Sequence, residues 1–183
     1  MAASTRTEHD LLGDREVPAH AYYGVHSLRA LENFPITRTA ISIYPDLVVA
    51  LACVKQAAAI ANSELGLLDE PRAQAIRLAC EEVRAGKLLE EFVVDVIQGG
   101  AGTSTNMNAN EVIANLALEQ LGHQKGEYQF VNPNDHVNFG QSTNDIYPTA
   151  FRLALILRLG NYMEALRQLQ EAFFAKGREF ARV

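Results

Sequence analysis

Two stretches of hydroxyl and amide side chains are the parts of this sequence best suited to chemistry. The first places three hydroxyls and three amides within residues 103–111, directly after a glycine cluster. The second is the run Gln-Ser-Thr-Asn-Asp at residues 141–145. Both offer neutral hydrogen-bond donors beside helix-forming sequence and almost no cations, which suits a small carboxylate anion held at a helix N-terminus. The sequence therefore predicts chemistry on a small acid.

The glycine cluster at residues 99–102 is weak evidence by itself, because such clusters are usually turns. It is not a dinucleotide-binding loop, since no hydrophobic strand and no acidic residue at the right distance accompany it. It is not a Walker loop either, because no Gly-Lys-Ser/Thr follows it. The six hydroxyl and amide side chains of residues 103–111 disfavour a helix there unless each forms a hydrogen bond. We therefore expect some of them to cap the helix and the others to face a ligand.

Other kinds of site are not indicated. His123 and His136 are too far apart to form a local ligand pair, and neither belongs to an HExxH or Cys/His pattern. Ser142 has no GxSxG elbow around it, so a nucleophilic serine is not predicted. We therefore expect no metal site and no nucleophilic serine.

The composition limits which binding partners and which cellular compartment we expect for this protein. The 183 residues are 48% hydrophobic and 21% charged, with a net charge of −6, which is typical of a soluble domain with a real core. The chain has no compact basic run, so neither nucleic acid nor an anionic membrane is an expected partner. No apolar signal segment follows the first residues, and the longest apolar run, 47–54, is too short to span a bilayer. With two cysteines in no CxxC spacing, we expect a cytoplasmic protein with buried, reduced thiols.

Helices are the elements that must position the two polar stretches. Residues 1–45 look irregular, because glycines and prolines interrupt short apolar clusters. Beyond them, apolar spacing, cap residues and glycine stops predict helices over residues 46–65 (capped by Asp46), 70–85 (capped by Asp69), 106–121 and 149–183.

The last predicted helix differs from the others in its length and its apolar surface. At 1.5 Å per residue it would be about 50 Å long. Apolar residues follow a spacing of three and four along it, with one gap at Lys176. They form a heptad seam made of Leu155, Leu159, Tyr162, Leu166, Leu169, Phe173 and Phe180. Such a helix needs partners, which are either other subunits or the rest of a longer protein. We favour the second interpretation and expect oligomerisation as well.

With these segments in view, the chain resembles the aspartase/fumarase superfamily of lyases. The resemblance covers nearly the whole chain through three ordered segments, 13–34 (GDREVPAHAYYGVHSLRALENF), 100–115 (GAGTSTNMNANEVIAN) and 132–150 (NPNDHVNFGQSTNDIYPTA). It implies a mainly α fold of the L-aspartase-like type. Residues 1–146 would form the N-terminal helical domain, and residues 147–183 the first long helix of a central bundle, truncated here.

Within the superfamily, details favour the lyases that act on aspartate over the class II fumarate hydratases. Fumarases usually read GSGTQSNMN, with a hydroxyl at the position of Ala101 and glutamine at the position of Ser104. They usually carry histidine at the position of Asn132 and a second serine at the position of Thr143. The run 122–128 (GHQKGEY) is also similar to the aspartases. Fumarate hydratase therefore remains the alternative.

The resemblance implies conversion of L-aspartate to fumarate and ammonia by anti elimination, without a cofactor. The proton to be removed lies beside the β-carboxylate, which must take up charge as an aci-carboxylate, so donors must be aimed at it beforehand. By resemblance, Thr103, Ser142 and Thr143 would donate to that carboxylate. Asn144 would hold the amino group that leaves as ammonia. Neutral donors bind the substrate without a fixed cation that would over-stabilise the ground state.

The same resemblance shows what these residues lack. The family's base serine lies on a loop with a GSSxMPxKxNP-like pattern, and a threonine-histidine pair from a middle segment completes the pocket; neither pattern occurs here. We therefore expect no catalytic residue in this chain and no activity from the chain alone. The family builds each site from several subunits of a homotetramer. A truncated, non-catalytic paralogue that acts in subunit assembly is the second alternative.

Overall fold

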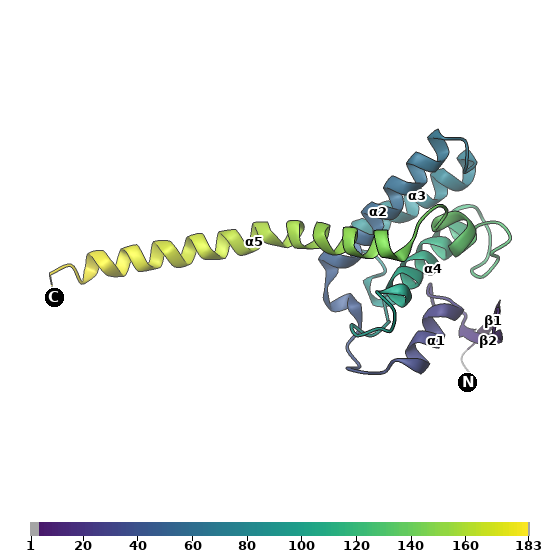
Figure 1. Ribbon diagram of the computed structural model, residues 1–183, viewed down its shortest axis with the longest axis horizontal. Coiled ribbons are helices and arrows are strands. Elements are labelled where there is room, and N and C mark those ends of the chain that lie inside the picture. Colours follow the sequence, from purple (N-terminus) through teal and green to yellow (C-terminus); the bar gives the residue numbers. More distant parts are fainter. Residues whose placement is uncertain (1–3, 183) are drawn as a thin grey trace.

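The computed structural model describes residues 4–182 and shows a helical body from which one long helix projects (Figure 1). Helices predominate, as the sequence predicted. The helices and strands, in chain order, are β1 (Thr5–Asp10), β2 (Gly13–Pro18), α1 (Val25–Asn33), the 3-10 turn η1 (Ile41–Ile43), α2 (Pro45–Glu64), α3 (Glu70–Arg84), the 3-10 turn η2 (Leu89–Glu91), α4 (Thr103–Gln120), the π-helical turn η3 (Pro133–Val137) and α5 (Thr143–Glu179).

The prediction that residues 1–45 are irregular was wrong for residues 5–33, where two strands and a helix form. Strands β1 and β2 form an antiparallel hairpin in register from Thr5 opposite Pro18 to Asp10 opposite Gly13. Helix α1 follows, and its Arg29 side chain holds the hairpin by donating from Nε to Asp10 Oδ2 at 2.7 Å. These elements depend on contacts between segments, which local patterns do not reveal.

Helix α1 shows this dependence most clearly, because its N-terminus has no cap from its own residues. The fully buried Glu111 carboxylate, on α4, accepts hydrogen bonds from the backbone N–H groups of Gly24 (2.9 Å) and His26 (2.7 Å). Glu8, on β1, accepts from the N–H of Val25 at 2.8 Å. Two distant carboxylates therefore satisfy donors that a local cap residue would otherwise take.

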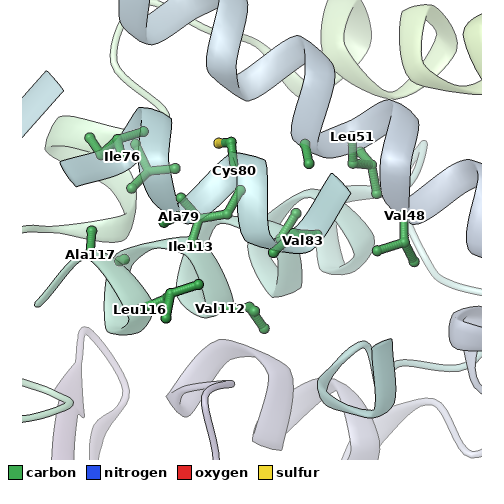
Figure 2. Close-up of a cluster of buried hydrophobic side chains, with 14 of the residues drawn as sticks. Val48, Leu51, Ile76, Ala79, Cys80, Val83, Val112, Ile113, Leu116 and Ala117 are labelled. Carbon is green, nitrogen blue, oxygen red and sulfur yellow. The ribbon is translucent and has the colours of Figure 1, made fainter. Parts of the chain in front are cut away.

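The core lies where α2, α3 and α4 pack together (Figure 2). The labelled side chains come from all three helices and are Val48, Leu51, Ile76, Ala79, Cys80, Val83, Val112, Ile113, Leu116 and Ala117. Both cysteines are free; Cys80 is buried as predicted, whereas Cys53 is only half-buried. The apolar faces of three helices thus form one continuous core.

The boundaries of α2 and α3 nearly match the sequence predictions. Asp69 caps α3 as expected, because its carboxylate accepts from the N–H of Arg72 at 3.2 Å. The predicted cap of α2 was wrong: the helix begins at Pro45, so Asp46 lies inside its first turn. Pro45 suits that first position because its missing N–H would have no intrahelical partner there.

Helix α2 is long and apolar enough by composition to cross a membrane. In this structure it packs against α3 and α5. Six of its apolar side chains belong to the core, namely Leu47, Val48, Ala50, Leu51, Ala52 and Ala59. Burial inside the protein therefore accounts for its composition.

Helices α4 and α5 both begin earlier than predicted. Helix α4 starts at Thr103 rather than residue 106, and α5 starts at Thr143 rather than residue 149. Pro148 lies inside α5, whereas the prediction counted it among the turn residues that precede the helix. Helix α5 ends at Glu179, and residue 183, its predicted end, lies outside the described residues. The predicted domain division between residues 146 and 147 falls within α5 and stays a prediction.

Candidate functional site

The first polar stretch forms the N-terminus of α4. Its cap residue, Gly102, has the left-handed backbone conformation (φ 88°) that glycine adopts without strain. Thr103, the first residue of the helix, is exposed, and its N–H donates to the carbonyl of Gly100 at 3.0 Å. A side chain at position 102 would also meet the ring of Tyr147, on α5, because a Cβ there would lie 2.6 Å from it. Glycine is therefore needed both for the turn and for the approach of α5.

The second polar stretch forms the N-terminus of α5. Ser142 caps this helix, because its Oγ accepts from the N–H of Asn144 at 3.2 Å. Ser142 and Asn144 are exposed, whereas Thr143 is half-buried. The positive end of the helix dipole lies at these residues and favours a negative ligand.

The two helix N-termini lie against each other. Asn106, one turn into α4, donates from Nδ2 to Thr143 Oγ1 at 3.1 Å, and the ring of Tyr147 packs on Gly102. The structure thus brings the predicted residues Ser142, Thr143 and Asn144 beside the helix that begins with Thr103. Within residues 4–182, Thr103 makes no hydrogen bond to the other three. Two helix N-termini with neutral donors make this a candidate site for a small anion. The roles that the sequence assigned to these four residues stay predictions.

A buried lysine beneath these termini was missed in the sequence. Lys55, on α2, has no exposed surface, and its Nζ donates to Asn138 Oδ1 at 2.7 Å and to Gln141 Oε1 at 2.9 Å. Asn138 Oδ1 also accepts from Asn106 Nδ2 at 3.1 Å. Lys55 is therefore joined to Thr143 through two amide side chains.

The environment of Lys55 disfavours its charge. Burial lowers the pKa of the amine to about 7, and the neighbouring Cys80 thiol has its own pKa raised by burial. A sequence signal existed, since Lys55 is the only charged residue in the run 47–61, which is otherwise apolar except for Gln56. A charged side chain in the buried stretch of a core helix is rare unless it has dedicated partners.

The side-chain oxygen of Asn106 is a hydrogen-bond acceptor without a partner in the described part of the chain. The side chain is almost fully buried (1% exposed), and within residues 4–182 its Oδ1 has no hydrogen-bond partner. Buried polar atoms are rarely left unpaired. The atom is thus available to a ligand or to a segment outside the described residues.

No metal centre is formed by the described part of the chain: within residues 4–182, no group of three or more His, Cys, Asp or Glu side chains could hold an ion. The Nδ1 atom of His136, one of the two histidines considered above, accepts from the N–H of Asn132 at 2.8 Å. The expectation that no cofactor is required stays a prediction.

Comparison with known proteins decides the family. A family model described as "Lyase" matches residues 13–183. The chain belongs to this lyase family. The aspartate ammonia-lyase of Pseudomonas fluorescens is 62% identical to this lyase chain over 182 residues, which are 100% of the chain and 38% of the relative. That of Escherichia coli (strain K12) is 57% identical over 181 residues, again 38% of its length. The lyase chain thus spans 38% of the curated relatives it matches.

Solved structures agree with this assignment. A fumarate lyase:delta crystallin from Brucella melitensis superposes with a TM-score of 0.97 at 58% identity, over 98% of this chain and 42% of that one. A class II fumarase from Schistosoma mansoni superposes with a TM-score of 0.78 at 40% identity, over 83% of this chain and 32% of that one. The predicted superfamily and its mainly α fold are therefore confirmed for this lyase chain.

Proposed function

We propose that this chain supplies the N-terminal part of an aspartate ammonia-lyase, which converts L-aspartate to fumarate and ammonia. The observation that carries the proposal is the meeting of the α4 and α5 N-termini, which presents neutral donors at two positive helix ends. The 62% identity to a curated aspartate ammonia-lyase supports aspartate as the substrate.

In the proposed reaction a base removes a proton from the carbon beside the β-carboxylate, and the electron pair moves into that carboxylate. The electron pair then returns from the aci-carboxylate, which re-forms the carboxylate and makes a double bond between the two central carbons as the C–N bond breaks. The protonated amino group takes the C–N bonding pair and leaves as ammonia. Thr103, Ser142 and Thr143 would donate hydrogen bonds to the developing charge, and Asn144 would hold the amino group. The base would lie on a segment other than these residues.

We also propose a cytoplasmic homotetramer whose active sites are shared between subunits. Helix α5 projects from the body (Figure 1), and this supports the proposal because the apolar side chains of its predicted seam are exposed. Tyr162 keeps 58% of its surface exposed, and Phe173 keeps 70%. A seam at heptad spacing is typical of helices that pack into bundles. The exposed donors at the helix N-termini are compatible with a site that other segments complete.

Two alternatives make different predictions. Fumarate hydratase is less well supported, because the class II fumarase shares 40% identity with this chain, against 62% for the aspartate ammonia-lyase. A non-catalytic role in subunit assembly is favoured by one observation, the exposed apolar seam of α5. That role would require the chain to join intact lyase subunits through α5.

Activity assays on the full-length gene product test the proposal. We expect release of fumarate from L-aspartate, whereas preferential hydration of fumarate to malate would favour the hydratase. Thr103→Ala and Ser142→Ala should each lower kcat/KM by about 2–4 kcal/mol of transition-state stabilisation. Ser63→Ala serves as the control, because it removes a hydroxyl whose one hydrogen bond within residues 4–182 goes to the exposed Glu70. Unchanged kinetics in either site variant would contradict the assigned role.

The isolated chain of residues 1–183 separates the catalytic role from the assembly role. We expect it to show no turnover of L-aspartate, so appreciable activity would contradict the proposal that other segments supply the base. Mixed oligomers with an intact aspartate ammonia-lyase, measured by light scattering, would favour the assembly role.

A further inference from the structure

A hydrogen-bonded chain runs from the core to the candidate site. It begins at Lys55 Nζ, passes through Asn138 Oδ1 and Asn106 Nδ2, and ends at Thr143 Oγ1, with links of 2.7, 3.1 and 3.1 Å. The amine has no carboxylate partner among residues 4–182, although it is fully buried. Its partners are instead two amide oxygens of the segment that leads into α5.

The lysine fixes which way the two amides face. The charged ammonium form of Lys55 can only donate hydrogen bonds, and the neutral amine still carries two hydrogens that can be donated. These two hydrogens match the two contacts of Nζ with Asn138 and Gln141. Asn138 and Gln141 must therefore turn their oxygens toward Lys55. Their nitrogens then face acceptors: Asn138 Nδ2 donates to the carbonyl of Gln141 at 3.0 Å, and Gln141 Nε2 donates to that of Val137 at 2.9 Å. Each amide is thus satisfied in one orientation only.

The same constraint passes to the next side chain. Because Asn138 presents its oxygen, Asn106 must present its NH₂ group to it. That NH₂ group also contacts Thr143 Oγ1, so the Thr143 hydroxyl acts as an acceptor toward Asn106. The hydroxyl hydrogen of Thr143 is therefore left to point away from Asn106. A threonine held in this way is a pre-oriented donor at the N-terminus of α5.

We propose that Lys55 is a positioning residue, which acts through Asn138 and Asn106 to keep the Thr143 hydroxyl a donor toward the substrate carboxylate. This inference rests on the proposed function, in which Thr143 stabilises the charge that develops on that carboxylate. Lys55 does not touch the substrate. Donors fixed before the reaction stabilise a transition state without reorganising, which is the advantage of such a chain.

Isosteric variants of the full-length gene product test the direction of the chain. In Asn106→Asp both terminal oxygens are acceptors, so the Thr143 hydroxyl would turn toward position 106, and kcat should fall by about a hundredfold, with KM changing less. Lys55→Met keeps the length of the side chain but removes the amine, and kcat should fall by about tenfold.

Asn62→Asp is the matched control, because Asn62 lies on α2 and donates to the carbonyl of Phe139 outside the chain of bonds. It should leave kcat unchanged. Circular dichroism and light scattering show whether each variant folds and assembles as the wild type does. Folded Asn106→Asp and Lys55→Met proteins with wild-type kcat would overturn the proposal.

Neutron diffraction from crystals of the wild-type protein gives an answer that needs neither activity nor a folded variant. We expect the deuterium on Thr143 Oγ1 to point away from Asn106, and a deuterium directed at Asn106 would overturn the proposal. Wild-type protein without turnover of L-aspartate would refute the proposed function and the substrate that it assigns to Thr143. The direction of the hydrogen-bonded chain would then still be decided by the neutron map.

Discussion

Replacing Lys55 by methionine is expected to change how the stability of the protein depends on pH. Burial lowers the pKa of this amine from 10.5 to about 7 in the folded protein. At pH values between about 7 and 10.5, the amine has therefore lost its proton in the folded state but still binds it in the unfolded chain. Stability must then rise with pH across this window, and the buried charge costs most at pH values below about 7.

The magnitude follows from the two pKa values. Linkage gives a gain of ~2 kcal/mol in the free energy of unfolding between about pH 6 and pH 8.5, at 25 °C. Lys55→Met has no amine to titrate and lacks this gain. Its stability at any one pH also reflects Gln141 Oε1, which loses a donor at a cost of about 1–3 kcal/mol. The change with pH is therefore more informative than stability at one pH.

Urea unfolding of the 183-residue chain and of its Lys55→Met variant, followed by circular dichroism between pH 6 and 8.5, measures the difference directly. Groups that titrate in both proteins cancel when the two free energies are subtracted. The Cys80 thiol beside Lys55 stays uncharged throughout, because burial raises its pKa. A difference in the free energy of unfolding that stays constant across this range would refute the pKa argument.

Three further predictions concern the packing around the site. Glu111→Gln should lower the free energy of unfolding by about 2–4 kcal/mol, measured by urea unfolding, because the amide turns a donor toward the N–H groups that the buried carboxylate now accepts. Gly102→Ala should cost about 1–3 kcal/mol more than Gly66→Ala in the same assay. Both glycines have positive φ, but only a Cβ at Gly102 would meet an atom within 4 Å, the ring of Tyr147. In NMR titration His26 should show a pKa above 6.5, because it is hydrogen-bonded to Glu111. Its stabilising effect is then complete below pH 6.5 and is lost as the pH rises through the raised pKa.

The candidate site could be located from the sequence because its parts are local. Thr103 and Ser142 each stand where a helix begins, and the hydroxyl and amide residues around them mark a cap and a donor surface. Their order and spacing also carried the resemblance to the superfamily. Lys55 was missed because its role depends on Asn138 and Gln141, 83 and 86 residues away. The sequence of α2 alone does not predict which side chains from other segments will accept hydrogen bonds from its buried amine.

The sequence by itself determined the four longer helices, the superfamily and the two segments that supply the donors. Apolar periodicity, caps and glycine stops act over a few residues, so they can be read along the chain. Only the tertiary structure decided the N-terminal hairpin, the start of α1 and the orientation of the donors. Helix α1 begins where it does because Glu111, 87 residues from Gly24, accepts its first N–H groups. The Thr143 hydroxyl is oriented by a lysine on another helix, because the direction of a hydrogen bond is set by its partners in space.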